Sequence, residues 1–381
     1  MVSRSSFTRQ RQIRILSWLF TLIICSIDLY HRNRRADFKR IAVDNRDYSL
    51  LQQNKNSSYD DIVKVYSPTN STSNVAMCIL VRNETLYFDE WIDYQIGLGF
   101  SPIYIYDNSD DFELMYGLHS GIYSWYDTRS DIREHIRLVH YPTMDRFVNG
   151  YSVTSAHYPA FDQCVKQDAI NSTFAALFDA DEFLVLNKFD NVVDFMHHYC
   201  PKSCGQLSIN WRNMGISNQK QYRPIPVTRR NVNWNPWESQ SGFVKAIVRP
   251  TYVADRSSHY VHVVDLKKGN HLDTTGQPVK VKFHFQNERI VDDVAVLFHY
   301  GTKSEGEFYY KTCVKKRDDV KGFSFCGQKG KYFSVYNGTI FDDSAWKQLT
   351  RMVPKYRRFG EAENITFGPS EGYALWLESQ Q

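Results

Sequence analysis

The stretch Val75–Asn108, VAMCILVRNETLYFDEWIDYQIGLGFSPIYIYDN, contains the pattern that decides the fold. It opens with the apolar run Val75–Val81, which predicts a buried strand. Residues 85–98 then repeat large apolar side chains at helical spacing, and Gly99 is expected to close this helix. Ile103–Tyr106 predicts a second strand. A strand, a helix and a strand in succession form a βαβ unit, so the chain is expected to fold as an α/β domain.

Apolar and amphipathic segments continue this pattern towards the C-terminus. The expected strands are residues 136–141, 175–178, 183–186 and 206–211, and the expected helices are residues 158–170 and 190–199. The prediction is one α/β domain over residues 75–381, with a Rossmann-like mixed sheet flanked by helices and a more irregular second half. Residues 31–74 are polar and without periodicity, and are predicted to be a stem or linker.

Composition excludes several classes of protein. The 381 residues are 42% hydrophobic and 23% charged, which are ordinary globular values. The net charge of +4 is concentrated at the N-terminus, where residues 1–40 carry nine Lys and Arg against two Asp, so the rest of the chain is slightly acidic. A nucleic-acid-binding domain would have a basic surface of its own, so no nucleic-acid partner is expected. The oligomeric state is left open.

One apolar run lies within this basic N-terminal segment. Residues 13–30 include Ile15–Ile27 (ILSWLFTLIICSI) and are predicted to be a transmembrane signal anchor, preceded by a cytoplasmic tail over residues 1–12. A cleaved signal peptide is the alternative. No cleavage site of the A-x-A kind follows the run, which favours a retained anchor.

Sequons and cysteines indicate that the part of the chain after the apolar run is lumenal. The N-x-S/T sequons all follow the apolar run and lie at Asn56, Asn70, Asn83, Asn171, Asn337 and Asn364. Six cysteines follow Cys25, an even number that suits an oxidising compartment. The plausible bridges are Cys200–Cys204 and Cys313–Cys326, whereas Cys78 and Cys164 lie in apolar patterns and are either paired or buried thiols.

The segment Phe178–Phe183, FDADEF, is the motif most indicative of chemistry. Its three carboxylates follow a predicted buried strand and would repel one another without a cation or hydrogen-bond donors among them. The pattern predicts a divalent metal site in which Asp179 and Asp181 are ligands and diphosphate oxygens complete the shell. Their repulsion predicts that the empty site is costly. A solvated turn is the alternative, and an EF-hand is excluded because Leu184 stands where glycine is needed.

Polar residues also follow the first two predicted strands. Arg82 and Glu84 follow the first strand, and Asp107 closes the second. Ligands of open α/β sheets bind beyond the carboxyl ends of the strands, so these side chains are expected to bind a nucleotide. Asn83 lies in the same place, and whether it carries a glycan is left open. Neither a G-x-G-x-x-G motif nor a P-loop is present, which excludes dinucleotide-type and ordinary NTPase sites.

Blocks along the chain resemble glycosyltransferase family 92 and its GT-A relatives. In order they are Cys78–Glu84, Glu90–Tyr94, Leu98–Phe100, Tyr104–Asn108, Phe178–Leu184, Trp211–Arg212, Lys245–Pro250, His299–Ser304, Glu307–Phe308 and Lys311. The resemblance covers about residues 76–320. It implies a GT-A fold and an inverting, Mn²⁺-dependent transfer of a sugar from a UDP-sugar, usually UDP-galactose, to a glycan or glycoprotein. With the predicted anchor, it implies a single-pass type II Golgi membrane protein whose catalytic domain is lumenal.

The resemblance also implies roles for individual residues. Asp179, Asp181 and His299 are the expected metal ligands, Asp179 also contacts the nucleotide sugar, and Lys303 is expected to bind the diphosphate. The acceptor residues implied are Trp211, Arg212 and Trp237, and the general base is Glu238. This chain reads Pro226–Arg230, PVTRR, where the family often has Glu before Arg, which leaves acceptor recognition open.

Three alternatives remain at this stage. The first is a glycosyltransferase with another nucleotide-sugar donor, and the second is a non-catalytic glycan-binding membrane glycoprotein of the same fold. The third is a metal-dependent phosphodiesterase or nuclease. It is disfavoured because the only further His clusters are His197-His198 and His259-x2-His262.

Overall fold

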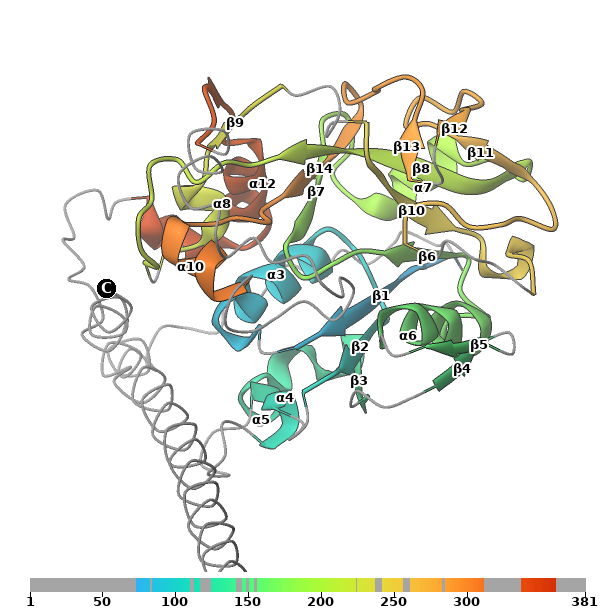
Figure 1. The fold of residues 1–381 in the computed structure, drawn as a ribbon, viewed down its shortest axis with the longest axis horizontal. Helices are drawn as coiled ribbons and strands as arrows, with labels where there is room; N and C mark the ends of the chain where they lie inside the picture. The colour runs from blue at the N-terminus through green and yellow to red at the C-terminus, as the bar shows by residue number, and fades with distance from the viewer. Residues whose placement is uncertain are drawn as a thin grey trace, which may run out of the picture. The chain divides into compact units, whose positions relative to one another are not determined.

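The computed structural model describes residues 73–82, 84–109, 113–116, 125–141, 146–148, 151–153, 156–223, 225–236, 242–255, 261–282, 285–311 and 337–360. All of them belong to one unit, residues 58–367 (Figure 1). Within these ranges no helix has the length and apolar character needed to cross a membrane. The predicted tail, the anchor at residues 13–30 and the predicted stem up to residue 72 lie outside them.

The predicted βαβ unit is present. It consists of β1 (Val75–Val81), α3 (Thr85–Gly97) and β2 (Ile103–Asp107), and β1 pairs in parallel with β2 and with β6 (Phe174–Leu177). Successive side chains of β1 alternate between two hydrophobic clusters on opposite faces of the sheet. A parallel strand covered on both faces reads as a continuous apolar run, which explains why the run at Val75 is visible in the sequence.

The central sheet is mixed, as the sequence predicts. It has nine strands in the order β3-β2-β1-β6-β10-β8-β14-β7, and β11 pairs with β8. Strand β10 is antiparallel to both of its neighbours, whereas β14 is parallel to β8 and antiparallel to β7. The further bounds are β3 (Ile136–His140), β7 (Glu182–Leu186), β8 (Cys204–Asn213), β10 (Val244–Val248), β11 (Asn270–Leu272) and β14 (Ala295–His299).

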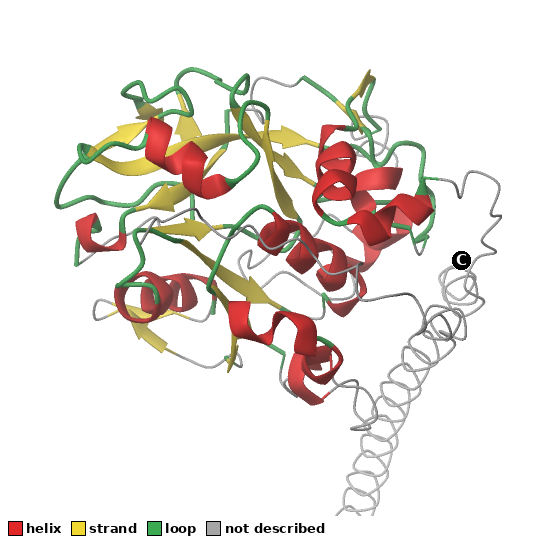
Figure 2. Ribbon diagram, turned by 180° about the vertical axis from the view of Figure 1, so that it is seen from behind, coloured by secondary structure: helices red, strands yellow, loops and turns green. Residues whose placement is uncertain are grey.

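A short connection requires this sheet to curl. Strands β6 and β7 are separated by β10, β8 and β14, yet only residues 178–181 join them. In a flat sheet, four inter-strand steps would separate them by about 19 Å. The connecting chain reaches about 17 Å when fully extended, and it turns. The sheet therefore curls around residues 178–181, and the strands accordingly run in several directions in the ribbon (Figure 2).

Helices cover both faces of the sheet (Figure 2). On one face α3, α7 (Val192–Tyr199) and α12 (Ser344–Met352) contribute to the larger cluster, and on the other α6 (His157–Gln163) and the π-helical turn η3 (Cys164–Asp168) contribute to the smaller one. Side chains of α3 fix it to β7, because Trp91 Nε1 and Gln95 Nε2 both donate to the carbonyl of Glu182.

The remaining elements are short and lie mostly in the second half, in line with the irregularity expected there. The helix expected at residues 158–170 is divided between α6 and η3. The other elements are α4 (Glu113–Tyr116), α5 (Trp125–Thr128), η2 (Ser130–His135), β4 (Arg146–Val148), β5 (Tyr151–Val153), α8 (Val227–Arg230), β9 (Asn233–Trp234), η4 (Pro250–Tyr252), β12 (Val281–Lys282), β13 (Gln286–Asn287), α10 (Glu305–Tyr309), β15 (Ile340–Phe341) and η7 (Pro354–Phe359).

Two disulfides cross-link the described residues. Cys200 is joined to Cys204, the pairing expected from their spacing, and Cys78 is joined to Cys164. The second bridge answers the open question about these two cysteines and ties β1 to η3 across the smaller hydrophobic cluster. Cys313 and Cys326 lie outside the described residues, so their pairing stays a prediction.

The two bridges are expected to differ in their contribution to stability. Replacing Cys78 and Cys164 together by Ala should lower the free energy of unfolding by about 4–5 kcal/mol, because the bridge closes a loop 86 residues long. Replacing Cys200 and Cys204 should cost about 2 kcal/mol, since only 4 residues separate them. Denaturant unfolding of both double variants measures the difference, and equal losses would contradict the loop-entropy explanation.

Candidate active site

The curl of the sheet brings several strand ends to one edge. Residues 178–181 follow β6, and β8 and β14 end nearby at Asn213 and His299. Because β10 and β7 run the opposite way, their first residues lie at the same edge. In the sheet register, His299 lies opposite both Asn213 and Glu182. The D-x-D segment is therefore surrounded by side chains of β7, which follows it directly, and of β8, β10 and β14, which are distant in sequence.

Asp181 and His299 form the core of this site. The Nε2 atom of His299 lies 3.6 Å from Oδ1 of Asp181, and its Nδ1 atom lies 2.9 Å from Oδ1 of Asn213. An amide oxygen only accepts hydrogen bonds, so Nδ1 carries the hydrogen and Nε2 presents a lone pair towards the carboxylate. Burial lowers the pKa of His299 to about 4, which keeps the ring neutral. A neutral imidazole oriented by a second hydrogen bond is typical of a metal ligand.

Asp179 has different partners. Its Oδ2 atom lies 2.6 Å from Nζ of Lys245, and its Oδ1 atom lies 3.3 Å from Nε2 of His157. Lys245 is 1% exposed and also lies 3.5 Å from Oε1 of Glu182. Burial alone would raise the pKa of Asp179, but the Lys245 ammonium and the bond to His157 hold that pKa well below its ordinary value. Asp179 is thus an ion-paired carboxylate.

Asp181 also has a lysine partner. Nζ of Lys311 lies 2.6 Å from Oδ2 of Asp181, and the backbone carbonyl of Asp181 accepts from the amide of Tyr300 at 2.8 Å. Burial would raise the pKa of Asp181, but Lys311 and His299 hold it below its ordinary value. Lys245 and Lys311 are thus the hydrogen-bond donors expected among these carboxylates, one for each aspartate, and they offset the repulsion between the two. The cost of the empty site stays a prediction.

The donor set fits a divalent metal in part. Among the residues that the structure describes, no group of three or more His, Cys, Asp and Glu side chains could hold an ion. The predicted set of Asp179, Asp181 and His299 is therefore not assembled as one ligand group, since Asp179 is paired with Lys245 and His157. The Asp181–His299 pair retains one carboxylate oxygen and one imidazole lone pair that suit a metal whose other positions are filled by diphosphate and water.

Two of the predicted nucleotide-binding residues come together beside this pair. Nζ of Lys303 lies 3.9 Å from Oε2 of Glu84 and 4.1 Å from the centre of the Tyr87 ring. Lys303 is buried and has a φ of 56°, a strained backbone conformation for a residue with a side chain. Burial lowers its pKa. Arg82 is half-buried directly after β1.

Asp107 stabilises the loop that follows β2 by hydrogen bonds within that loop. The side chain is 1% exposed, and Oδ1 accepts from the amide and the hydroxyl of Ser109. Its Oδ2 atom accepts from the amide of Leu114 at 2.9 Å. Asp107 is the last residue of β2, as expected, but its carboxylate holds the chain that follows this strand. Its contact with a nucleotide stays a prediction.

The predicted acceptor residues are also engaged within the protein. The Trp211 ring stacks on His299, with ring centres 4.3 Å apart, and on Phe243 at 5.3 Å. Arg212 pairs with Asp292 at 2.6 Å and with Asp342, which joins β8 to the C-terminal segment. Trp211 thus supports the His299 ring, and Arg212 fixes the strand end. Trp237 and Glu238 lie outside the described residues.

The predicted glycosylation sites fall into two groups. Asn171 is exposed, whereas Asn337 is half-buried and its amide donates to Oδ1 of Asn218 at 2.6 Å. Asn56, Asn70, Asn83 and Asn364 lie outside the described residues.

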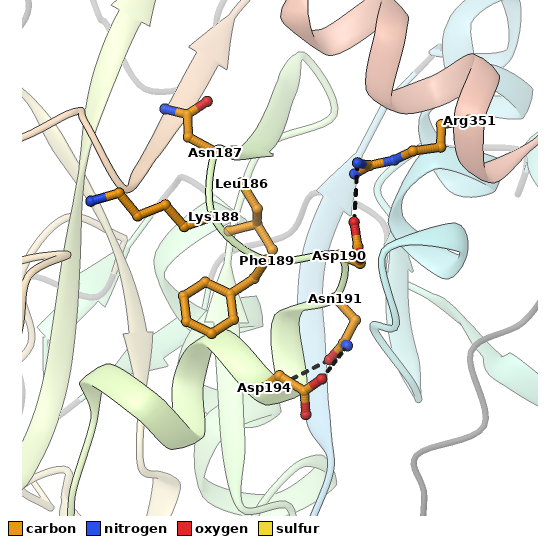
Figure 3. Close-up of a pocket in the computed structure, with 8 residues that line it drawn as sticks. All are labelled: Leu186, Asn187, Lys188, Phe189, Asp190, Asn191, Asp194 and Arg351. Atoms are coloured by element: carbon orange, nitrogen blue, oxygen red, sulfur yellow. Dashed lines mark hydrogen bonds and ion pairs between the residues drawn. The ribbon is translucent and has the colours of Figure 1, made fainter.

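A cavity of about 580 Å³ lies at the other end of β7. Figure 3 shows Phe189 and Asp190 on one wall and Arg351 reaching across to Asp190, with a separation of 3.0 Å. None of the predicted site residues lines this cavity. It is therefore separate from the edge of the sheet that carries Asp181.

Sequence reasoning assigned no role to four residues of the site. Lys245 and Lys311 stand in the blocks that resemble family 92, but nothing in the sequence showed that they pair with the D-x-D carboxylates. His157 and Asn213 gave no signal, because their positions beside Asp179 and His299 depend on long-range packing.

The comparisons with known proteins agree with the resemblance. The model of glycosyltransferase family 92 matches residues 73–321. A glycosyltransferase family 92 protein of Oryza sativa subsp. japonica is 22% identical over 214 residues, which are 56% of this chain and 33% of that protein. The matched part thus spans about a third of the length of the relative. A solved mannosyltransferase of Pyrobaculum calidifontis, in complex with GDP-Man and Mn²⁺, is 11% identical with a TM-score of 0.31, over 91% of this chain and 88% of the other. At that TM-score the likeness says nothing about this chain.

The buried lysine at the site generates a prediction. Lys245→Met should lower the free energy of unfolding by about 3 kcal/mol or more, because it leaves Glu182, which is fully buried, and Asp179 without their cation. Adding Asp179→Asn should restore part of the loss. Lys267→Met is the control, since Lys267 and its partner Asp255 are both exposed, and it should change stability by less than about 0.5 kcal/mol. If Lys245→Met had the same free energy of unfolding as the wild type, the proposed charge compensation by Lys245 would be contradicted.

Proposed function

The chain belongs to glycosyltransferase family 92, and from this premise we propose that it transfers a sugar from a nucleotide-sugar donor to a glycan acceptor. The reaction is placed at the edge of the sheet that carries Asp181 and His299. We propose a GT-A fold for the domain, and the curled mixed sheet with its D-x-D turn supports that assignment. A UDP-sugar, with galactose as its sugar, is the donor that the resemblance favours.

The observation that carries the proposal is the Asp181–His299 pair. Its neutral imidazole lone pair and carboxylate oxygen suit a divalent cation, for which Mn²⁺ is the choice that the resemblance favours. When bound, such a cation would neutralise the charge that develops on the departing nucleoside diphosphate. The protein's own part is to hold the two ligands in place. Asn213 fixes the tautomer of His299, Trp211 supports its ring, and Tyr300 fixes the backbone of Asp181.

A second group of residues is assigned to the donor. Lys303 has a buried side chain and a strained backbone conformation. Strain of this kind is concentrated at functional sites. We assign Lys303 to the diphosphate and Arg82 and Glu84 to the rest of the nucleotide. Lys303 lies near enough to lower the pKa of Asp181, so its charge acts on the same site as the Asp181–His299 pair.

The acceptor side is assigned from the resemblance alone. An inverting transfer needs a base that removes the proton of the attacking hydroxyl. Glu238 keeps this role, with Trp237 beside it at the acceptor. Trp211 and Arg212 act indirectly, because the Trp211 ring packs against His299 and the Arg212 guanidinium is held by two aspartates.

A second candidate function is glycan binding without turnover. The observation in its favour is that Lys245 and Lys311 already compensate both aspartates, so the site is electrostatically balanced by the protein itself. Release of nucleoside diphosphate from a nucleotide sugar would support the transferase, whereas glycan binding without such release would support the second candidate.

For localisation, we propose a type II Golgi membrane glycoprotein with a lumenal catalytic domain. The apolar segment at residues 13–30 and the sequons that follow it support this proposal. Two disulfides in the described part of the chain also support an oxidising compartment.

The transferase proposal predicts turnover of one nucleotide sugar. The purified full-length chain is incubated with a panel that includes UDP-galactose, other UDP-sugars and GDP-mannose, and the released nucleoside diphosphate is measured with Mn²⁺ or with EDTA. Asp181→Asn should lower turnover by at least about 100-fold, because the cation loses a ligand at the leaving group. Asp255→Asn is the control, because Asp255 is 93% exposed and pairs with Lys267, which is not among the candidate site residues. Normal turnover of Asp181→Asn would remove the metal assignment, and glycan binding without any release would support the second candidate.

The localisation proposal predicts two outcomes in cells. Glycosidase treatment should increase the mobility of the protein on a gel, since sequons follow the apolar segment. Washing membranes with carbonate should leave the protein in the pellet. Release by carbonate together with a new N-terminus near residue 30 would show a cleaved signal peptide.

A further inference from the structure

The lysines that compensate the two site aspartates differ in how firmly they are held. Lys245 is 1% exposed and is shared between Asp179 and Glu182. Its ammonium therefore has two carboxylate partners and no path to water. Lys311 follows α10, and its side chain is 31% exposed. Besides Asp181, it contacts the carbonyl of Gly301, at 3.4 Å. Lys245 is thus enclosed between two carboxylates, whereas the Lys311 side chain is partly exposed to solvent.

The position of Lys311 matters because it shares Asp181 with His299. Lys311 lies on Oδ2 of the carboxylate, and the His299 lone pair is directed at Oδ1. A divalent cation held by Asp181 and His299 would lie within a few ångströms of the Lys311 ammonium. Two positive charges so close together repel each other strongly in a partly buried site. The ammonium and the cation are therefore competitors for one carboxylate.

We propose that Lys311 is an exchangeable counter-ion of Asp181, which occupies the carboxylate before a divalent cation binds and then transfers its ammonium to the diphosphate of the donor. This inference rests on the proposed function for the identity of the anion. It assigns Lys311 to the donor site and makes the binding of cation and nucleotide cooperative, because the diphosphate offers the displaced ammonium a new anionic partner. Asp179 takes no part in the exchange, since Lys245 stays with it.

The structure offers a matched control for Lys311. Nζ of Lys355 lies 2.7 Å from Oδ2 of the buried Asp93, and the Lys355 side chain is 34% exposed. It therefore has the same type of partner and nearly the same exposure as Lys311. Asp93 also pairs with Arg129 and accepts from Tyr356, and none of these residues belongs to the candidate active site. Lys355→Met removes one ammonium from a buried aspartate without touching the site.

The test is a Mn²⁺ titration of the purified full-length protein without nucleotide, with free Mn²⁺ followed by electron paramagnetic resonance. Lys311→Met should bind Mn²⁺ about three- to tenfold more tightly than the wild type, as expected for the loss of a partly exposed competing ion pair. Lys311→Arg, which keeps the charge, and Lys355→Met should both bind as the wild type does. Thermal unfolding of each variant checks that it is folded, and Lys311→Gln serves as a second neutral variant.

The second measurement is the affinity for UDP at saturating Mn²⁺. Lys311→Met and Lys311→Gln should bind UDP about three- to tenfold more weakly, while Lys355→Met should be unchanged. Unchanged or weaker Mn²⁺ binding by folded Lys311→Met, or no Mn²⁺ binding by any of the proteins, would overturn the exchange. These outcomes are independent of turnover. Tighter Mn²⁺ binding by Lys311→Met in a protein that turns over no nucleotide sugar would support the competition at Asp181 and count against the proposed transferase.

Discussion

The connection of four residues between β6 and β7 constrains the rest of the structure. It is too short to join two strands that lie four positions apart in a flat sheet, so the sheet has to curl around it. The curl brings the ends of β8 and β14 to the D-x-D segment, which already lies beside the start of β10, the neighbour of β6, and before the start of β7. Lys245, Lys311 and His299 contact the two aspartates from distant parts of the sequence, and His299 reaches Asp181 because the sheet curls.

The D-x-D segment carries buried like charges, and two lysines compensate the charges of its aspartates. Asp179, Asp181 and Glu182 lie within one short segment, and burial disfavours the charged form of each. Lys245 compensates Asp179 from β10, and Lys311 compensates Asp181 from the end of α10. Glu182 is the exception, since burial raises its pKa well above the ordinary value. Its Oε2 atom accepts from the amide of Asp179. The glutamate therefore shapes the turn that holds the two aspartates.

Much of the fold follows from local sequence patterns. The runs at Val75, Ile103 and Ala175 become strands buried on both faces, and continuous apolar segments of this kind are visible without a structure. The helix at residues 85–97 and its end beside Gly99 were equally readable. The order of the strands could not be predicted from the sequence, because the position of β7 next to β14 depends on pairing across more than 100 residues.

Only those site residues could be predicted that the sequence identifies by a motif or by their position at the end of a predicted strand. The D-x-D segment and His299 could be found, and the structure brings Asp181 and His299 together. Asp107 was found in the right place but is used by its own loop, because hydrogen bonds to Ser109 and Leu114 leave no trace in an apolar pattern. Lys245, Lys311 and His157 have no spacing relation to the aspartates. The Cys78–Cys164 bridge also spans too long a segment for spacing to predict it.

That bridge connects the scaffold to the site. Cys164 begins the π-helical turn that continues α6, and α6 starts with His157, which contacts Asp179. Cys78 lies in the centre of β1, and β1 pairs with β6, the strand that leads into the D-x-D segment. The disulfide therefore fixes α6 to the same part of the sheet that positions Asp179. Lys245 holds Asp179 from β10 and His157 holds it from α6, so two separate elements fix this carboxylate. Asp181, in contrast, shares its carboxylate between the partly exposed Lys311 and His299, which is why the proposed exchange is assigned to this aspartate.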